Sequence, residues 1–179
     1  ACSRNTLCRQ VEAAAAMGYR MNMGVETEFF VFRDTGDGGF APASQRDDLA
    51  KPCYDTTSIM DTFPLLTELV ESMNGLGWDV YSFDHEDANG QFEIDFQYTD
   101  ALTMADRFVF FRMMAKELAH RHGYFASFMP KPFADRTGSG AHLNMSLADA
   151  NTGENLFLSE ADPHGCGLSR LGYQFIAGI

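Results

Sequence analysis

Acidic residues recur at alternate positions in two segments whose composition is typical of β-strands. Glu26 and Glu28 alternate with apolar residues in the segment 20–33, and Glu93 does the same in 91–97. Side chains alternate across a strand with a period of two, so each segment places its carboxylates on one face. Neighbouring anions repel one another, and the cost grows near an apolar region. A bound cation would remove that cost.

A third segment repeats the pattern with different polar groups. In 141–147, His142, Asn144 and Ser146 alternate with apolar residues, and the acidic connection 84–90 adds further carboxylates. If the three strands belong to one sheet, their polar faces form the floor of one cavity. Carboxylate oxygens with one imidazole suit Mg²⁺ or Mn²⁺ better than Zn²⁺.

Each of these patterns also has a plainer explanation. A polar face on a half-exposed antiparallel strand is commonly just solvated. Residues 84–87 also fit a solvated turn, and His142 alone also fits an exposed or internally hydrogen-bonded histidine. Periodicity therefore leaves metal binding and simple solvation both open.

The spacing of apolar residues and the turn residues predict the elements that position these groups. Helices are expected at 7–17, 59–76, 101–122 and from Leu168 onward. Strands are expected at 20–33, 78–83, 91–97, 124–129, 141–147 and 155–158, with turns or irregular segments at 34–39, 37–57, 84–90, 131–138 and 149–153. Sequence-adjacent strands interrupted by helices predict an α+β fold with a mainly antiparallel sheet and helices packed on one face.

Composition and charge narrow the class of partner. The 179 residues are 45% hydrophobic and carry a net charge of -12, which disfavours nucleic acid and anionic membranes as partners. Four scattered cysteines without a CxxC pair predict free thiols. No apolar run approaches the ~20 residues that span a bilayer, and no signal peptide is visible, so we expect a cytoplasmic protein. The first residue is Ala1 and the last segment reads as an interrupted helix, so we expect an incomplete domain.

Three motifs, in order, resemble one known family. The sixteen residues from Lys131 to Ser146 combine Lys-Pro, a Gly-rich turn, His and Ser, and this long motif resembles the ATP-region signature of the glutamine synthetases. Gly24-Val-Glu-Thr-Glu and the Gly-Gln-x-Glu of 85–94 resemble two further segments of that family, and the similarity extends from Leu7 to Ile179. Segments 51–55, 85–91 and 128–133 resemble the bacterial branch that includes the γ-glutamylmethylamide synthetases.

The resemblance implies an ATP-dependent ligase that joins ammonia, or another small amine such as methylamine, to the γ-carboxylate of L-glutamate through γ-glutamyl phosphate. It implies two or more Mg²⁺ or Mn²⁺ ions. Glu28, Glu86 and Glu93 resemble ligands of the first ion, and Glu26 and His142 resemble ligands of the second. We accordingly predict Glu86 and Glu93 as catalytic residues.

The same resemblance suggests which residues bind the substrates. Residues at positions near the nucleotide are Tyr81, Tyr98, Asn144 and Ser146, and those near the substrate glutamate are Thr137 and Gly138. Two positions depart from the family pattern, which commonly has Asn in place of Thr137 and often His in place of Asn144. The family also implies a ring-shaped homo-oligomer with active sites between subunits. Residues 1–179 would then be part of one catalytic domain, without its N-terminal domain and C-terminal remainder, and inactive alone.

Two other classes of protein remain as alternatives. Glu26 and Glu28 also fit a hydrolase that uses paired carboxylates as acid and base, although such chemistry does not call for the motif at 131–146. A non-catalytic relative with a decayed site is the second alternative, and the departures at Thr137 and Asn144 favour it slightly.

Overall fold

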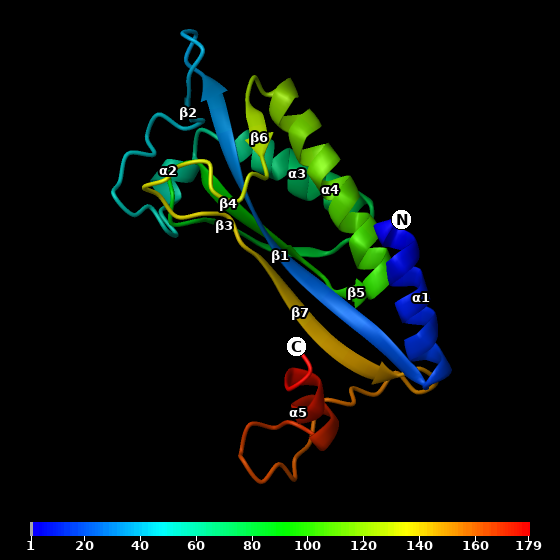
Figure 1. Ribbon diagram of the computed structural model, residues 1–179. Helices are drawn as coiled ribbons and strands as arrows, with labels where there is room; N and C mark the ends of the chain where they lie inside the picture. Colours follow the sequence, from blue (N-terminus) through cyan, green and yellow to red (C-terminus); the bar gives the residue numbers. More distant parts are fainter. Residues whose placement is uncertain (1) are drawn as a thin grey trace. The chain divides into compact units, whose positions relative to one another are not determined.

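One long strand organises the chain. The computed structural model describes residues 2–179, and in it β1 (Tyr19–Asp34) lies at the centre of a seven-stranded sheet in which β2, β4, β5, β6 and β7 all pair with it (Figure 1). The other strands are β2 (Phe40–Pro42), β3 (Val80–His85), β4 (Gln91–Phe96), β5 (Thr99–Asp100), β6 (Phe125–Ser127) and β7 (Ala141–Asp149). The helices are α1 (Ser3–Ala16), α2 (Thr56–Ile59), α3 (Phe63–Gly75), α4 (Ala101–Arg121) and α5 (Arg170–Ile176).

The described chain divides into two compact units. The first unit comprises residues up to Gly24, then Tyr98–Asp106 and Asn144–Ile179. The second unit comprises Val25–Gln97 and Arg107–Leu143. Each unit is described by itself below.

The second unit is built on the antiparallel strands β1, β4 and β3. Phe29 lies opposite Phe92 across β1 and β4, and His85 lies opposite Phe92 on the other side. Alternation along these strands separates an apolar face, with Phe29, Phe92 and Ile94, from a polar face. This confirms the antiparallel sheet and the two-faced strands expected from the sequence.

Helices α3 and α4 cover the apolar face, on the same side of β1 in Figure 1. The ring of Phe111, on α4, lies 5.7 Å from that of Phe29, centroid to centroid. The ring of Phe63, at the start of α3, lies 6.0 Å from that of Phe83 on β3. Burial of such aromatic side chains supplies the main stabilisation of the sheet against the helices.

A second aromatic cluster anchors the loop that follows β6. Phe133 packs edge-on against Phe30 and Phe32, with ring centroids 6.0 and 5.5 Å apart, and Ala88 is buried in the same cluster. At this end of β1 both faces of the strand are buried. The loop 131–138 is therefore held against the sheet by a hydrophobic contact.

The helix predicted at 59–76 forms as α3, but it begins four residues later than expected, and the short helix α2 ends at the residue where the predicted helix began. α2 ends after Ile59, and α3 begins at Phe63 with Pro64 in its first turn. Proline has no backbone N–H, so it starts a helix more readily than it continues one. Between the helices, the Thr62 hydroxyl donates to the carbonyl of Ile59 at 2.9 Å and Asp61 accepts from the Ser44 hydroxyl at 2.9 Å.

Smaller differences occur at the ends of elements. The predicted strand at 155–158 is reduced to isolated bridges, from Ala148 to Asn155 and from Leu158 to Leu168. β3 starts and ends two residues later than expected, so it includes Asp84 and His85. The irregular segment expected at 37–57 contains the short strand β2.

Two general expectations are checked by the structure. All four cysteines lie within residues 2–179 and carry free thiols, as predicted. Over the same residues, no helix combines the length and the apolar character needed to cross a bilayer.

Candidate active site

Five carboxylates share the polar face of β1, β4 and β3 in the second unit. Glu28 lies directly opposite Glu93, and Glu93 lies opposite Asp84 on the next strand. Glu26 lies opposite Asp95 in the neighbouring row. We call this set the acidic face. Directly opposed side chains in an antiparallel pair are close neighbours, and like charges there destabilise the sheet.

Burial and mutual repulsion perturb these carboxyl groups. Burial, followed by the charges of Asp95 and Glu86, raises the pKa of Glu93 from 4.5 to about 7. Burial and the charge of Glu26 raise the pKa of Asp95 from 3.8 to about 6. Burial and the charge of Glu28 likewise raise the pKa of Glu86. Both causes penalise the ionised form, so a bound cation would lower the free energy of this face.

The donor chemistry of the acidic face fits a divalent cation. Within residues 2–179, no hydrogen-bond donor reaches the buried Oδ1 atom of Asp95. Carboxylate oxygens are the donors that Mg²⁺, Mn²⁺ and Ca²⁺ prefer. Among the same residues, however, no three acidic, histidine or cysteine side chains stand close enough to chelate one ion as they are arranged. The structure therefore gathers the donors on one face without a preformed cage.

Glu86 follows β3 in a connection that is fixed by a buried ion pair. His85 is 2% exposed, and its Nε2 lies 2.7 Å from Oδ2 of Asp47. Its Nδ1 lies 2.8 Å from the backbone carbonyl of Glu86. Burial lowers the pKa of His85, but the Asp47 carboxylate and the Glu86 carbonyl together raise it above its usual range. Asp47 also accepts from the side-chain amide of Asn89 at 2.9 Å and from the backbone N–H of Gly90 at 2.5 Å.

His142, at the start of β7, lies beside the acidic face. Its Nδ1 is 2.9 Å from Oε2 of Glu26, and this hydrogen bond raises the pKa of His142. Gly140 approaches Glu28 so closely that a Cβ atom there would lie 2.9 Å from Oε1 of Glu28. The structure therefore brings His142 and Glu26 together, as predicted, and adds Gly140 as a point of close approach.

The loop 131–138 carries the two residues predicted to lie near glutamate. The hydroxyl of Thr137 donates to Oδ2 of Asp87 at 2.7 Å, so this side chain is engaged with the β3–β4 connection. The carbonyl of Gly138 accepts from the side-chain amide of Gln91 at 3.0 Å. A Cβ atom on Gly138 would lie 2.6 Å from the carbonyl oxygen of Pro130, which leaves no space for a side chain.

Three of the four residues predicted to lie near the nucleotide line one small cavity in the first unit. The cavity holds about 150 Å³ and is lined by Tyr98, Asn144 and Ser146, together with Met145 and residues 22–24 of β1. Tyr81 belongs to the second unit and lies instead beside the acidic face. Burial and the charge of Asp95 raise its pKa.

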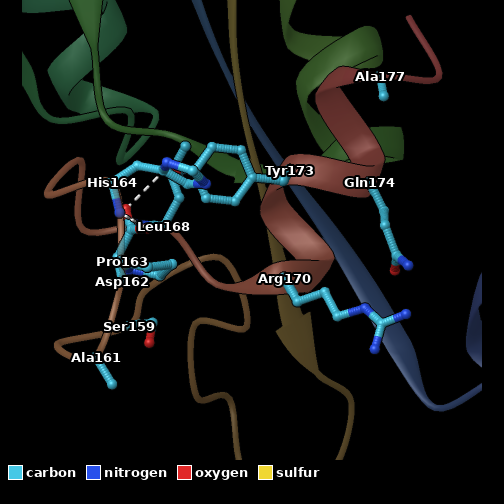
Figure 2. A pocket seen from close by; sticks show the side chains of 10 residues that line it. All are labelled: Ser159, Ala161, Asp162, Pro163, His164, Leu168, Arg170, Tyr173, Gln174 and Ala177. Carbon is cyan, nitrogen blue, oxygen red and sulfur yellow. Dashed lines mark hydrogen bonds between the residues drawn. The ribbon is translucent and has the colours of Figure 1, made fainter.

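A larger open cavity of about 560 Å³ lies beside α5 in the first unit (Figure 2). Asp162 organises its wall by accepting from the backbone N–H groups of His164 and Leu168 at 3.0 and 3.1 Å and from the Tyr173 hydroxyl at 2.9 Å. Its lining mixes apolar residues, such as Pro163 and Leu168, with polar ones that include Arg170. The motifs found in the sequence do not fall in this cavity.

Sequence reasoning missed several residues that the structure places at the candidate site. Asp84 and Asp95 belong to the acidic face. Asp95 shares the alternating polar face of Glu93 in 91–97, whereas Asp84 was expected in the connection 84–90 and lies on β3 instead. Gln91 was visible only as one more polar residue on β4. The ion pair between Asp47 and His85 was not predicted, because it joins residues 38 positions apart.

Comparison with known proteins adds independent evidence. The family model "Glutamine synthetase, catalytic domain" matches residues 1–179. A glutamate–methylamine ligase of Methyloversatilis universalis is 45% identical over 177 residues, which are 99% of this chain and 39% of that protein. A glutamine synthetase of Rhizobium leguminosarum bv. phaseoli is 42% identical over 176 residues, which are 98% of this chain and 39% of that protein.

A solved structure shares the fold. A GmaS/ADP complex is 43% identical and superposes with a TM-score of 0.90 over 98% of this chain and 39% of that one. The chain therefore spans 39% of the length of each of these three proteins.

Proposed function

Because this chain belongs to the glutamine synthetase family through its catalytic domain, we propose that the protein carrying it uses ATP to join ammonia to the γ-carboxylate of L-glutamate. The observation that carries this proposal is the acidic face. Glu28 opposes Glu93 and Glu26 opposes Asp95, and the pKa of Glu93 rises to about 7. A soluble protein that only needed a solvated strand would not oppose carboxylates in two adjacent rows.

Two or more divalent cations, Mg²⁺ or Mn²⁺, are part of the proposal. Glu28, Glu86 and Glu93 would hold one ion, and Glu26 and His142 would hold another. When bound, the ions supply positive charge that neutralises the phosphates of ATP and stabilises charge in the transition state. The acidic face suits this task, because repelled carboxylates bind cations and the chain itself is strongly anionic.

The residues proposed to bind the nucleotide and glutamate lie mainly in the small cavity and in the loop 131–138. Tyr98, Asn144 and Ser146 line a common cavity, which supports their assignment to the nucleotide. The assignment of Tyr81 to the nucleotide rests on the family resemblance alone. Gly138 would offer its backbone to glutamate. Thr137 would act through the loop, since its hydroxyl is bound to Asp87.

The reaction has two steps. An oxygen of the glutamate γ-carboxylate attacks the γ-phosphorus of ATP, ADP leaves, and γ-glutamyl phosphate forms. The amine nitrogen then attacks the γ-carbonyl carbon, loses a proton, and inorganic phosphate leaves with the C–O bond electrons. The chain's own residues bind and orient the reactants, which is where most of the rate enhancement in phosphoryl transfer arises.

Methylamine is a second candidate for the amine. It is favoured by the 45% identity to a protein named glutamate–methylamine ligase and by the TM-score of 0.90 to GmaS. The same reaction scheme applies to both amines, and only the nucleophile in the second step differs.

We also propose that the activity resides in a longer, ring-forming homo-oligomer of which residues 1–179 form one part of a catalytic domain. The greater length is supported by relatives 42–45% identical to this chain that are matched over only 39% of their length, and the ring is what the family resemblance implies. A cytoplasmic location is part of the same proposal.

The experiment is a phosphate-release assay on the protein at the full length of its relatives. ATP, glutamate and Mg²⁺ or Mn²⁺ are supplied with ammonia, methylamine and ethylamine in turn. We expect release that requires glutamate, metal and amine together, fastest with ammonia. Release fastest with methylamine would select the second candidate. ATP-independent hydrolysis of a glycoside, or no metal-dependent release with any amine, would contradict the proposal.

A further inference from the structure

A buried side-chain amide joins three parts of the candidate site. Gln91, the first residue of β4, is 0% exposed. Its Nε2 donates to Oε2 of Glu28 at 2.7 Å and to the backbone carbonyl of Gly138 at 3.0 Å, and it lies 3.5 Å from the hydroxyl of Ser139. Its Oε1 accepts from the backbone N–H of Ala88 at 3.1 Å. One side chain thus touches β1, the loop 131–138 and the β3–β4 connection.

The partners of Gln91 fix the orientation of its amide. The two partners of Nε2 at shorter distance are a carboxylate and a carbonyl, which only accept hydrogen bonds, and the partner of Oε1 is an N–H group, which only donates. Turning the amide over would place oxygen against oxygen and N–H against N–H. The observed arrangement is therefore the one that satisfies the buried polar groups.

The loop at Gly138 has little freedom to move away from this amide. The N–H of Ser139 donates to the carbonyl of Pro130 at 2.8 Å, and the same carbonyl lies against Gly138 on the side where a Cβ atom would stand. Near the start of the loop, Phe133 packs in the aromatic cluster against Phe32. Gln91 thus holds the far end of a loop that is already packed at its near end.

We propose that Gln91 is a positioning residue that couples the carboxylate of Glu28 to the loop carrying Gly138, so that cation binding and glutamate binding favour each other. The inference rests on the proposed function, which assigns Glu28 to a cation and Gly138 to glutamate. Its physical basis is that one amide cannot keep both hydrogen bonds unless Glu28 and the loop occupy matching positions. A cation that fixes Glu28 therefore also fixes the loop.

The test removes the amide and keeps its volume. Gln91→Met is similar in size and leaves Glu28, Gly138 and Ala88 without their shared partner. Gln97→Met is the matched control, because Gln97 follows the same strand and its side chain is exposed. Mn²⁺ affinity of the full-length protein is measured by calorimetry, with and without saturating glutamate, and glutamate affinity is measured with and without Mn²⁺.

In the unmodified protein and in Gln97→Met, we expect glutamate to tighten Mn²⁺ binding, and Mn²⁺ to tighten glutamate binding by the same factor. In Gln91→Met we expect Mn²⁺ affinity to fall by roughly 10- to 100-fold, as for other residues that orient a metal ligand, and the coupling factor to fall to about one, since the amide that carries it is gone. An unchanged coupling factor in Gln91→Met, or no coupling in the unmodified protein, would overturn the inference.

Steady-state kinetics separate this role from a structural one and from the proposed function. With Mn²⁺ raised to saturate each protein, we expect Gln91→Met to raise the KM for glutamate while the KM for ATP stays unchanged. A lowered Tm and kcat with both KM values unchanged would identify a structural role and reject positioning. Coupled binding of Mn²⁺ and glutamate without phosphate release would reject the proposed ligase reaction and leave the role of Gln91 intact.

Discussion

The ionised form of a carboxylate at this site is less stable than the ionised form on an ordinary protein surface. The raised pKa of Glu93 and that of Asp95 have the same two causes, which are burial and like charge. Such groups are costly to the folded protein unless something positive binds there. Local instability at the acidic face is therefore expected to be the physical source of cation affinity.

Replacing Glu93 with glutamine separates stability from function. In the full-length protein, Glu93→Gln should lower metal-dependent phosphate release by at least about 100-fold, because a ligand of the first ion is lost. It should also raise the Tm of the metal-free protein by about 1–4 °C, because a repelled carboxylate becomes neutral. Phosphate release and a thermal melt in a chelator measure the two effects. Glu71→Gln, at an exposed position on α3, is the control that should change neither. Near-normal turnover would refute the assignment of Glu93.

At the scale of elements, the β3–β4 connection is held by a carboxylate distant in sequence. Asp47 receives hydrogen bonds from His85, Asn89 and Gly90, and all four residues lie within the second unit. Glu86 sits between these anchored positions. The connection is therefore fixed at both ends before any ligand binds.

Asp47→Asn should release this connection. One oxygen becomes an NH₂ group that faces donors, so the free energy of unfolding should fall by about 1–3 kcal/mol. Amide hydrogen exchange should rise at 85–90, and Mn²⁺ affinity should weaken because Glu86 is less well placed. Asp48→Asn, at the exposed neighbouring position, should leave all three measurements unchanged. Unchanged exchange at 85–90 in Asp47→Asn would show that the ion pair does not hold the connection.

The wall of the cavity beside α5 gives a prediction with a defined pH range. Burial raises the pKa of Asp162, but hydrogen bonds from His164, Leu168, Tyr173 and Cys166 outweigh it and lower the pKa from 3.8 to about 2. Between pH 2 and 4 the folded state thus binds fewer protons than the unfolded state. The Asp162 carboxylate therefore contributes fully to the free energy of unfolding above about pH 4, and this contribution is lost as the pH falls through 2.

Asp162→Asn should therefore lower the Tm at pH 5 to 7, and the difference from the unmodified protein should shrink as the pH falls from 4 towards 2. Thermal melts at a series of pH values measure this difference. Glu160→Gln, at an exposed position two residues away, is the control. A difference that is constant with pH would show that the Asp162 charge does not hold the wall of this cavity.

Sequence patterns predicted the helices and strands better than they predicted the contacts that hold the connecting segments in place. Period-two alternation located β1 and β4 and the faces of Glu26 and Glu28, because a strand's geometry is local. The same alternation places Asp95 on the polar face of β4. The start of α3 beside Pro64 was readable from the local sequence, because proline favours the first turn of a helix. The ion pair between Asp47 and His85 was not predicted, since it depends on packing between segments far apart in the chain.

At the scale of the whole molecule, the family motifs supplied what local patterns could not. The roles of Gly138 and Ser146 came from the resemblance in 131–146, and the catalytic-domain match over residues 1–179 confirms that family. In the structure, Gly138 lies in the loop 131–138 and Ser146 lies on β7, as their segments were expected to. Their roles stay predictions, since each depends on a ligand.

Residues 1–179 on their own should bind the cation without catalysing the reaction. Their relatives are matched over 39% of their length, and we propose that active sites lie between subunits of a ring. The isolated chain should therefore release no phosphate from ATP with glutamate and amine. Mn²⁺ should still raise its Tm, because the acidic face lies within the second unit and a ligand that binds only the folded state stabilises it.

Side-by-side assays of residues 1–179 and the full-length protein, with Glu93→Gln in both, test this separation of binding from turnover. Mn²⁺ stabilisation that disappears in Glu93→Gln of the isolated chain would place cation binding on the acidic face itself. Robust γ-glutamyl transfer by the isolated chain would contradict a site shared between subunits. Equal Mn²⁺ stabilisation of the isolated chain and its Glu93→Gln variant would show that the stabilising cation is not held by the opposed pair Glu28 and Glu93.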